Sequence, residues 1–217
     1  MEILQRFEEI VKNIKVPIIF EIGTNDGYHT NLMQQILKRV STKYDHYAFE
    51  PDPRLIDIFH NNNKTNAYHF YNYAIGAKTG SFDFHLSSGE EKRPTHVKQH
   101  FTGSSSLRKP KNVLTAWPDM QFHSTKVQVI TLDDFMTREK ISKIDFIWMD
   151  VQGCEIDVFE GAKNSLSKIR YIFTEYCDSE LYEGEIGLKE ILKMLPTFKL
   201  IEDYKGDVLL KNENFNQ

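Results

Sequence analysis

The segment from Glu21 to Gly27 combines residue types and a spacing that suit the binding of a small ligand. Two glycines four residues apart, Gly23 and Gly27, let the chain turn sharply and bring backbone N–H groups close to a bound molecule. A dinucleotide site needs the pattern G-x-G-x-x-G, but Asn25 stands at the second glycine position. A phosphate-binding loop would end in Gly-Lys-Ser or Gly-Lys-Thr, and Tyr28-His29 stand there instead. The segment therefore predicts a nucleoside site without a pyrophosphate, with a plain strand-to-helix turn as the alternative.

Glu50 is the second residue with a clear chemical task. It closes a predicted strand 29 residues after Glu21, where Rossmann-like sheets place an acid that accepts hydrogen bonds from both ribose hydroxyls. A carboxylate suits this task because it offers only acceptors, whereas the diol offers two donors. Pro51 and Pro53 make the following chain rigid. We expect Glu50 to bind a ribose, and a surface acid before a helix N-terminus is the alternative.

The elements that must position these residues follow from hydrophobic periodicity. The predicted strands cover residues 18–22, 47–50, 67–75, 81–86, 127–132, 144–150, 171–176, 199–202 and 208–211. The predicted helices cover 2–14, 30–40, 53–60, 155–166 and 188–195, with a short one opening at 132–135. This alternation predicts an α/β fold, a doubly wound and mostly parallel sheet with helices on both faces and a C-terminal antiparallel hairpin. The ligand crevice of such a sheet lies beyond the carboxyl ends of its strands.

We expect residues 1–217 to form a single domain, with 1–16 as an N-terminal helix. Residues 87–125 break the periodicity, and a segment of that length in a compact domain is usually a lid or a binding loop. We therefore predict an irregular lid or acceptor-binding insertion there, with a solvated loop as the alternative. Its basic residues would suit an acidic or phosphate-linked acceptor. Its other candidates for contacting a ligand are His96, His100, His123 and Trp117.

Four motifs together give a family resemblance. They are Glu21-Ile-Gly-Thr-Asn-Asp-Gly27, Phe49-Glu50-Pro51-Asp52-Pro53, Tyr73-Ala74-Ile75-Gly76, and the run from Asp145 to Ala162, which contains Asp150-Val-Gln-Gly153-Cys-Glu155. With these motifs and their spacing, residues 17–178 resemble the FkbM family of class I S-adenosylmethionine-dependent methyltransferases. The last motif of the family usually reads Asp-x-Glu-Gly-x-Glu, whereas Gln152 takes the place of its first Glu here.

The resemblance implies a class I methyltransferase fold with S-adenosylmethionine as cofactor. Glu21 would lie near the amino group of the methionine moiety. The backbone of Gly23, Thr24, Asn25 and Gly27 would lie near its carboxylate. Glu50 and Pro51 would hold the ribose, Asp150 would border the methyl group, and Asn72, Ala74 and Ile75 would flank the adenine. The stretch Ser104-Ser105-Ser106-Leu107 resembles a family loop that folds over the cofactor, and a plain linker is the alternative.

Three acids are candidates for catalysis. A sulfonium methyl group is already activated, so the enzyme must align a nucleophile and remove its proton. Asp150 follows three apolar residues, and partial desolvation would raise its pKa toward the range of a general base, with helix capping as the alternative. Glu155 would contact substrate or complement a helix dipole. Glu175 would act on the same rim, or bind Mg²⁺ with Asp150 and Asp178; a divalent metal is therefore left open.

Composition removes several classes of protein. Lys and Arg number 27 against 31 Asp and Glu, and this net charge of −4 argues against a nucleic-acid partner. No apolar run approaches the roughly 20 residues of a membrane span. The two cysteines are too few for a disulfide framework and suit reduced thiols in the cytoplasm.

The motifs therefore predict an O-methyltransferase that acts on a hydroxyl of a sugar or glycan. A sugar is favoured because an acidic rim with aromatic neighbours supplies the hydrogen bonds and stacking faces that a polyol needs. A polyketide-like or other natural product is the alternative acceptor. An NAD-dependent oxidoreductase and a non-catalytic Rossmann-like binding module are the other classes. The chain could also be one domain of a larger glycan-modifying protein.

Overall fold

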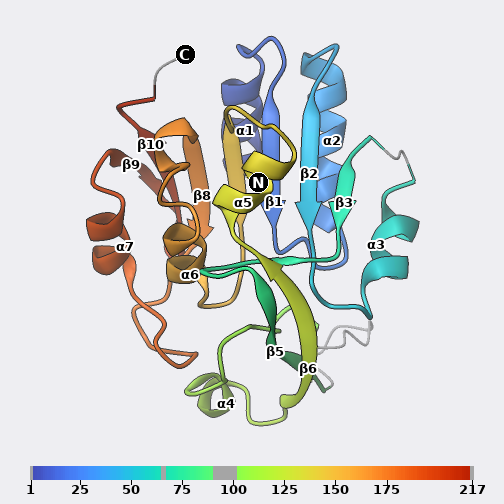
Figure 1. Ribbon diagram of the computed structural model, residues 1–217, viewed down its shortest axis with the longest axis vertical. Helices are drawn as coiled ribbons and strands as arrows, with labels where there is room; N and C mark the ends of the chain where they lie inside the picture. Colours follow the sequence, from blue (N-terminus) through green and yellow to red (C-terminus); the bar gives the residue numbers. More distant parts are fainter. Residues whose placement is uncertain (1, 65–66, 90–101, 216–217) are drawn as a thin grey trace.

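The computed structural model describes residues 2–64, 67–89 and 102–215, and at its centre lies a seven-stranded sheet (Figure 1). Its strands are β1 (Ile18–Ile22), β2 (Asp45–Phe49), β3 (His69–Tyr71), β7 (Phe146–Met149), β8 (Tyr171–Glu175), β9 (Phe198–Asp203) and β10 (Asp207–Asn212). The strand order is β3-β2-β1-β7-β8-β10-β9. The pairs from β3 to β8 are parallel, and β10 pairs antiparallel with β8 and β9. The predicted fold class and its C-terminal hairpin are confirmed.

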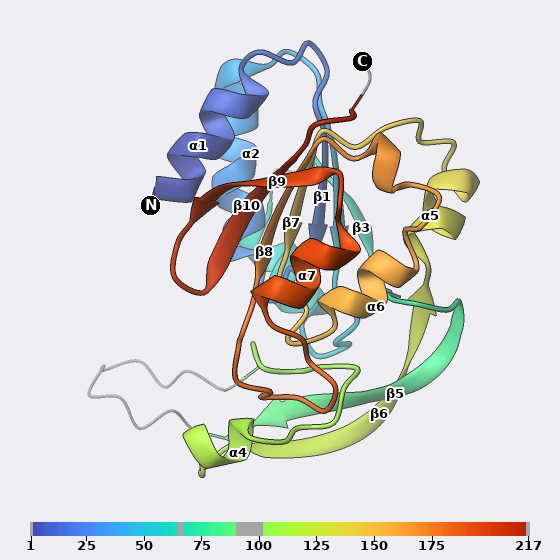
Figure 2. The ribbon, with the colours of Figure 1, turned by 90° about the vertical axis from the view of Figure 1, so that its left-hand side faces the viewer.

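Helices cover both faces of this sheet (Figure 2). On one face lie α1 (Glu2–Val11) and α2 (Tyr28–Val40), and on the other lie α5 (Leu132–Arg138), α6 (Glu155–Glu160) and α7 (Leu188–Met194). Alternate residues of β1 serve the two faces, since Ile19 packs under α1 and α2 while Phe20 and Ile22 pack under α5. This two-sided burial explains why the central strands are continuous apolar runs.

Three further strands form a second sheet, separate from the main one. It has the order β4-β6-β5, with β4 (Ala74–Ile75), β5 (Gly80–Ser88) and β6 (Gln121–Ile130). The expectation of one strand over residues 67–75 is wrong, because the chain divides at 72–73 between β3 of the main sheet and β4 of the second. Where the chain leaves the main sheet, the side-chain amide of Asn72 donates to the Glu50 carbonyl oxygen (2.7 Å).

The segment 87–125 is less irregular than expected. Residues 87–88 and 121–125 belong to β5 and β6, which form a long antiparallel ribbon, and the short helix α4 (Val113–Ala116) lies near its tip (Figure 2). The first half of β6 is largely exposed, so no apolar alternation marks it in the sequence. His96 and His100 lie outside the described residues.

Two helices begin or end at other residues than the hydrophobic periodicity predicts. The helix predicted over 155–166 stops at Glu160, and turns lead to the short 3₁₀ helix η1 (Leu166–Lys168). At Gly161 a Cβ atom would lie 2.1 Å from the carbonyl oxygen of Gly76, so only glycine fits there. The helix α3 (Ile56–Asn62) begins three residues later than the predicted start at Pro53. Among the described helices, none is long and apolar enough to cross a membrane.

Candidate active site

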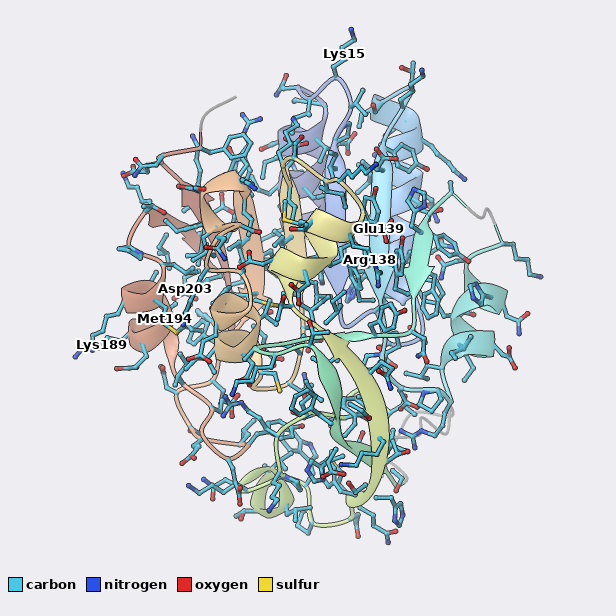
Figure 3. The ribbon with its side chains drawn as sticks, in the orientation of Figure 1. Lys15, Arg138, Glu139, Lys189, Met194 and Asp203 are labelled. Carbon is cyan, nitrogen blue, oxygen red and sulfur yellow. The ribbon has the colours of Figure 1, made fainter. Side chains whose placement is uncertain are left out.

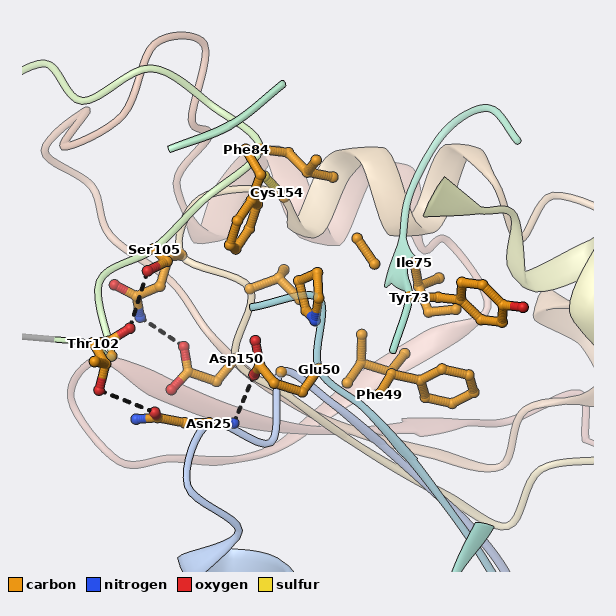
Figure 4. A pocket seen from close by; sticks show the side chains of 18 residues that line it. Asn25, Phe49, Glu50, Tyr73, Ile75, Phe84, Thr102, Ser105, Asp150 and Cys154 are labelled. Carbon is orange, nitrogen blue, oxygen red and sulfur yellow. Dashed lines mark hydrogen bonds between the residues drawn. The ribbon is translucent and has the colours of Figure 1, made fainter. Parts of the chain in front are cut away.

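A pocket opens where the carboxyl ends of β1, β2 and β7 meet the second sheet (Figure 4). Its empty volume, which includes space open to solvent, is about 580 Å³. Residues from the strand ends line it: Ile22, Gly23, Asn25, Phe49, Glu50, Pro51, Tyr73, Ala74, Ile75, Asp150, Val151, Gln152 and Cys154. Phe84 of β5 and residues Thr102, Gly103, Ser105 and Leu107 complete the lining. The motifs predicted from sequence therefore meet at one place.

The glycine-containing loop reaches the pocket at Gly23 and Asn25. Gly23 has φ +87°, and a Cβ atom there would lie 1.8 Å from the Asp150 carbonyl oxygen, so the close approach of β1 to β7 requires glycine. The loop N–H groups are largely used inside the protein: those of Gly23 and Thr24 donate to the Phe49 carbonyl oxygen, and that of Gly27 donates to the carbonyl oxygen of Thr24. The pocket is therefore bordered here by the Cα surface of Gly23 and by Asn25. Thr24 and Gly27 do not line it.

Glu50 is the acid that the pocket holds most firmly. Its Oε2 accepts from the Asn25 N–H and its Oε1 accepts from the Asp52 N–H, both at 2.8 Å. Each oxygen keeps a further lone pair for a ligand donor. Burial raises the pKa of this carboxyl to about 7 even though both N–H bonds oppose the rise. The carboxylate is thus a fixed acceptor beside Pro51 at the ribose position that the sequence predicts.

Glu21 points elsewhere. Its carboxylate accepts from the Thr30 hydroxyl (2.6 Å) and contacts His46 Nε2 (3.1 Å), and all three side chains are buried. It lies on the α2 face of the sheet and does not line the pocket. Its place near the amino group of a cofactor thus has no support in the geometry, and its contacts instead fasten the start of α2 to β1 and β2.

At the end of β7, Asp150 faces the crevice, where solvent reaches it. The Gln152 amide nitrogen lies 2.6 Å from Asp150 Oδ1 and 2.9 Å from Glu175 Oε2. Desolvation by the protein around the crevice raises the pKa of Asp150, and the hydrogen bond from Gln152 opposes this rise. Burial, followed by the nearby Asp150 charge, raises the pKa of Glu175 to about 9. The two carboxylates therefore form a pair joined by Gln152, and Asp150, which lines the pocket, is the stronger candidate for a base.

The remaining acids do not complete a metal site. Glu155 is buried and outside the pocket lining; burial and the Asp150 charge raise its pKa to about 8, and its Oε1 has no hydrogen-bond partner. Asp178 accepts from the Leu188 N–H at 3.2 Å. Among the residues that the structure describes, no group of three His, Cys, Asp or Glu side chains is arranged to hold a metal ion. The residues present do not fit the Mg²⁺ site considered from sequence.

The buried acids predict how stability depends on pH. Glu50, Glu155 and Glu175 have pKa values of about 7, 8 and 9 in the folded protein, above the ordinary 4.5. At pH values between 4.5 and these folded values, the folded state therefore binds more protons than the unfolded state. Their contribution is complete below pH 4.5 and is lost as the pH rises through the folded values. The free energy of unfolding should fall by about 1.4 kcal/mol per pH unit for each proton retained on folding.

Urea unfolding followed by circular dichroism across this range measures the trend. The variant Glu155→Gln has no titrating group at this position. Its free energy of unfolding should therefore fall less steeply with pH than that of the wild type below about pH 8. A free energy of unfolding that rises from weakly acidic to alkaline pH would contradict the assignment.

Comparison with known proteins decides the family. Residues 21–206 match the model of the methyltransferase FkbM domain. The chain belongs to the FkbM methyltransferase family. The resemblance seen in the four motifs is thereby confirmed, and the NAD-dependent oxidoreductase hypothesis is wrong.

Individual relatives of this FkbM methyltransferase extend the comparison. It is 37% identical over 202 residues to the 2-O-methyltransferase NoeI of Sinorhizobium fredii, covering 90% of this chain and 79% of NoeI. It is 21% identical over 185 residues to the hexuronic acid methyltransferase AglP of Haloferax volcanii, covering 84% of this chain and 63% of AglP. The crystal structure of an FkbM methyltransferase from Methylobacillus flagellatus superposes with a TM-score of 0.53 at 15% identity, over 90% of this chain and 43% of that one. This last match supports the fold.

The residues expected to flank the adenine lie at or beside the pocket in this FkbM methyltransferase. Ala74 and Ile75 line the pocket, and Asn72 stands beside it with its amide on the Glu50 carbonyl. Tyr73 also lines the pocket (Figure 4). The guanidinium of Arg138, the last residue of α5 (Figure 3), lies 5.4 Å from the centre of the Tyr73 ring. This cation–π contact fixes the wall of the pocket at that point.

Sequence reasoning missed Tyr182, which bonds to the loop beside the pocket. Tyr182 is buried, and its hydroxyl donates to the Ser104 carbonyl oxygen (2.7 Å). The Ser106 hydroxyl donates to the Gln152 carbonyl oxygen (2.7 Å). The loop around Ser104 thus lies over the pocket, as the family resemblance implied. Tyr182 falls in a stretch without periodicity or motif, so no signal in the sequence marked it. Trp117 does not line the pocket and is 40% exposed.

Proposed function

We propose that this FkbM methyltransferase takes S-adenosylmethionine as methyl donor and transfers the methyl group to a hydroxyl of a sugar or glycan. The observation that carries the proposal is the pairing, in one pocket, of a ribose acceptor at Glu50 with an ionisable carboxylate at Asp150. The names of two relatives, a 2-O-methyltransferase and a hexuronic acid methyltransferase, support a sugar hydroxyl as the acceptor. The reduced state of Cys154 and Cys177 supports a cytoplasmic site of action.

The residues present fit the donor. Glu50 would accept the two ribose hydroxyls, and the apolar surface of Ile75, Phe84 and Leu107 would enclose the adenine. When bound, the sulfonium supplies a methyl group that is already activated for transfer. The loop from Thr102 to Leu107 would shield this part of the pocket from water, because its bonds to Tyr182 and Gln152 hold it across the opening.

Asp150 would then take the proton from the acceptor hydroxyl. Its carboxylate is fixed on one side by Gln152 and is open to the crevice on the other, which is where an acceptor can approach. Glu175 would keep its own proton and so leave Asp150 as the ionised member of the pair. The reaction needs no further charged group beyond this base, since the leaving thioether carries no charge.

Labelled methyl transfer tests the proposal. The protein is incubated with methyl-labelled S-adenosylmethionine and a panel of neutral glycosides, uronic acid glycosides and polyketide-like alcohols, and the label is traced into product. We expect label in a sugar. Label only in a polyketide-like alcohol would overturn the sugar acceptor. In parallel, S-adenosylhomocysteine should raise the melting temperature and NAD should not. A protein that neither binds S-adenosylhomocysteine nor transfers label would be a binding module.

A further inference from the structure

Gln152 occupies an unusual backbone position directly after Asp150. It has φ +52°, in the left-handed region that a side chain of this kind seldom adopts, and Gly153 follows with φ +86°. A Cβ atom on Gly153 would lie 3.1 Å from the Tyr182 side chain. Such a conformation persists only where the surroundings fix it, and the Ser106 hydroxyl bonded to the Gln152 carbonyl oxygen is one of the groups that do so.

The side-chain amide of Gln152 joins two carboxylates. Its nitrogen donates to Asp150 Oδ1 (2.6 Å) and to Glu175 Oε2 (2.9 Å). A primary amide carries two N–H bonds, so each carboxylate receives one. An N–H bond to an ionised carboxylate is stronger than one to a neutral group, so the shared donor stabilises the ionised member of the pair.

The opposite end of the amide is also fixed. Gln152 Oε1 lies 3.3 Å from the Tyr182 hydroxyl, which also donates to the Ser104 carbonyl oxygen. The two acids set the orientation of the amide, because its nitrogen donates to Asp150 and Glu175 and its oxygen is then left facing the tyrosine. The loop over the pocket and the carboxylate pair are therefore connected through one side chain.

We propose that Gln152 is a positioning residue, whose amide holds Asp150 and Glu175 together and links this pair through Tyr182 to the loop over the pocket. The proposal rests on the proposed function only in taking Asp150 as the base. The ionisable groups around the pair come from several neighbouring elements. They are His29 of α2, Glu50 after β2, Glu155 of α6, Asp207 of β10, and Tyr182 and Glu185 from the connection between β8 and α7.

The variant Gln152→Met tests the proposal, because methionine has similar length and no donor. Loss of the N–H bond removes stabilisation of the ionised Asp150, so its pKa should rise and the low-pH limb of the kcat profile should move to higher pH. A hydrogen bond to a charged group corresponds to a shift of about one pH unit or somewhat more. We expect kcat to fall, while KM for S-adenosylmethionine and the affinity for S-adenosylhomocysteine stay near the wild-type values.

Two further measurements keep the inference separate from the proposed function. Infrared titration of the protonated carboxyl band, with no acceptor present, should show more protonated carboxyl in Gln152→Met than in the wild type at a given pH. Tyr182→Phe, which releases the amide oxygen, should shift both titrations in the same direction by a smaller amount. The exposed Gln128→Met on β6 is the matched control and should match the wild type in both.

An unchanged infrared titration and an unchanged kcat limb in Gln152→Met would overturn the role of Gln152. A loss of S-adenosylhomocysteine affinity as large as the loss of kcat would overturn it too, since it would show that Gln152 acts by binding the cofactor and not by positioning the carboxylate pair. A wild-type protein that transfers no methyl group would refute the proposed function, and the infrared titration would still decide the inference.

Discussion

Replacing Asp150 with Asn is expected to abolish methyl transfer while leaving cofactor affinity nearly unchanged. An asparagine fills the same space but cannot take a proton from the acceptor hydroxyl. Loss of a general base lowers turnover by about 10²–10⁴-fold. Labelled methyl transfer measures the rate, and isothermal titration with S-adenosylhomocysteine measures the affinity. Because Glu50 does not depend on the Asp150 side chain for its hydrogen bonds, the affinity should persist.

A matched control separates this effect from a general loss of acidic charge. Asp178 lies after β8, as Asp150 lies after β7. The carboxylate of Asp178 accepts from the Leu188 N–H, and the side-chain oxygen of an asparagine can accept the same hydrogen bond. Asp178→Asn should therefore keep turnover close to the wild-type value. Equal losses in Asp178→Asn and Asp150→Asn would show that the rate follows the charge of the rim, and full turnover in Asp150→Asn would remove it as the base.

Replacing Glu50 with Gln should weaken the binding of S-adenosylhomocysteine strongly. The variant loses a charged acceptor for the ribose, and its NH₂ group would face the N–H of either Asn25 or Asp52. Hydrogen bonds to charged groups contribute about 1.5–3 kcal/mol each, so the loss of two corresponds to an affinity decrease of about 10²-fold or more. Isothermal titration calorimetry measures it directly.

The pH dependence of binding gives a second test of Glu50. Its pKa of about 7 means that the carboxyl becomes a better acceptor as the pH rises through neutrality, so wild-type affinity should strengthen over that interval and Glu50→Gln should not. Glu21→Gln is the matched control, because Glu21 is a buried acid at the end of β1 that does not line the pocket. Loss of affinity in Glu21→Gln alone would restore its role at the cofactor.

Residues next to the strand ends were the most predictable part of the site. Glu50, Pro51 and Asp150 each follow a short apolar strand, and parallel strands bring their carboxyl ends to one edge of the sheet. Their position in the pocket therefore follows from chain order and strand periodicity alone. Glu21 shows the limit of this reasoning, since it is the fourth residue of β1 and points to the α2 face. Successive side chains on a strand point to opposite faces, so an error of one residue moves a group out of the site.

The second sheet and the bonds that close the pocket were not predictable from local pattern. The ribbon of β5 and β6 is exposed over much of its length, so polar residues are tolerated there and periodicity is lost. Tyr182 reaches Ser104 across 78 residues of sequence, a separation at which local pattern carries no information.

The sequence by itself determined the family, the fold class with its C-terminal hairpin, and the two carboxylates at Glu50 and Asp150, because these depend on motifs and on short-range periodicity. Only the tertiary structure decided that Glu21 is directed away from the pocket, that the loop N–H groups are already bonded within the protein, and that Gln152 joins Asp150 to Glu175. These features depend on contacts between segments distant in the chain, such as Glu21 with His46, Gly23 with the Phe49 carbonyl oxygen, and Gln152 with Glu175, and they are set by how buried polar groups find partners once the sheet has formed.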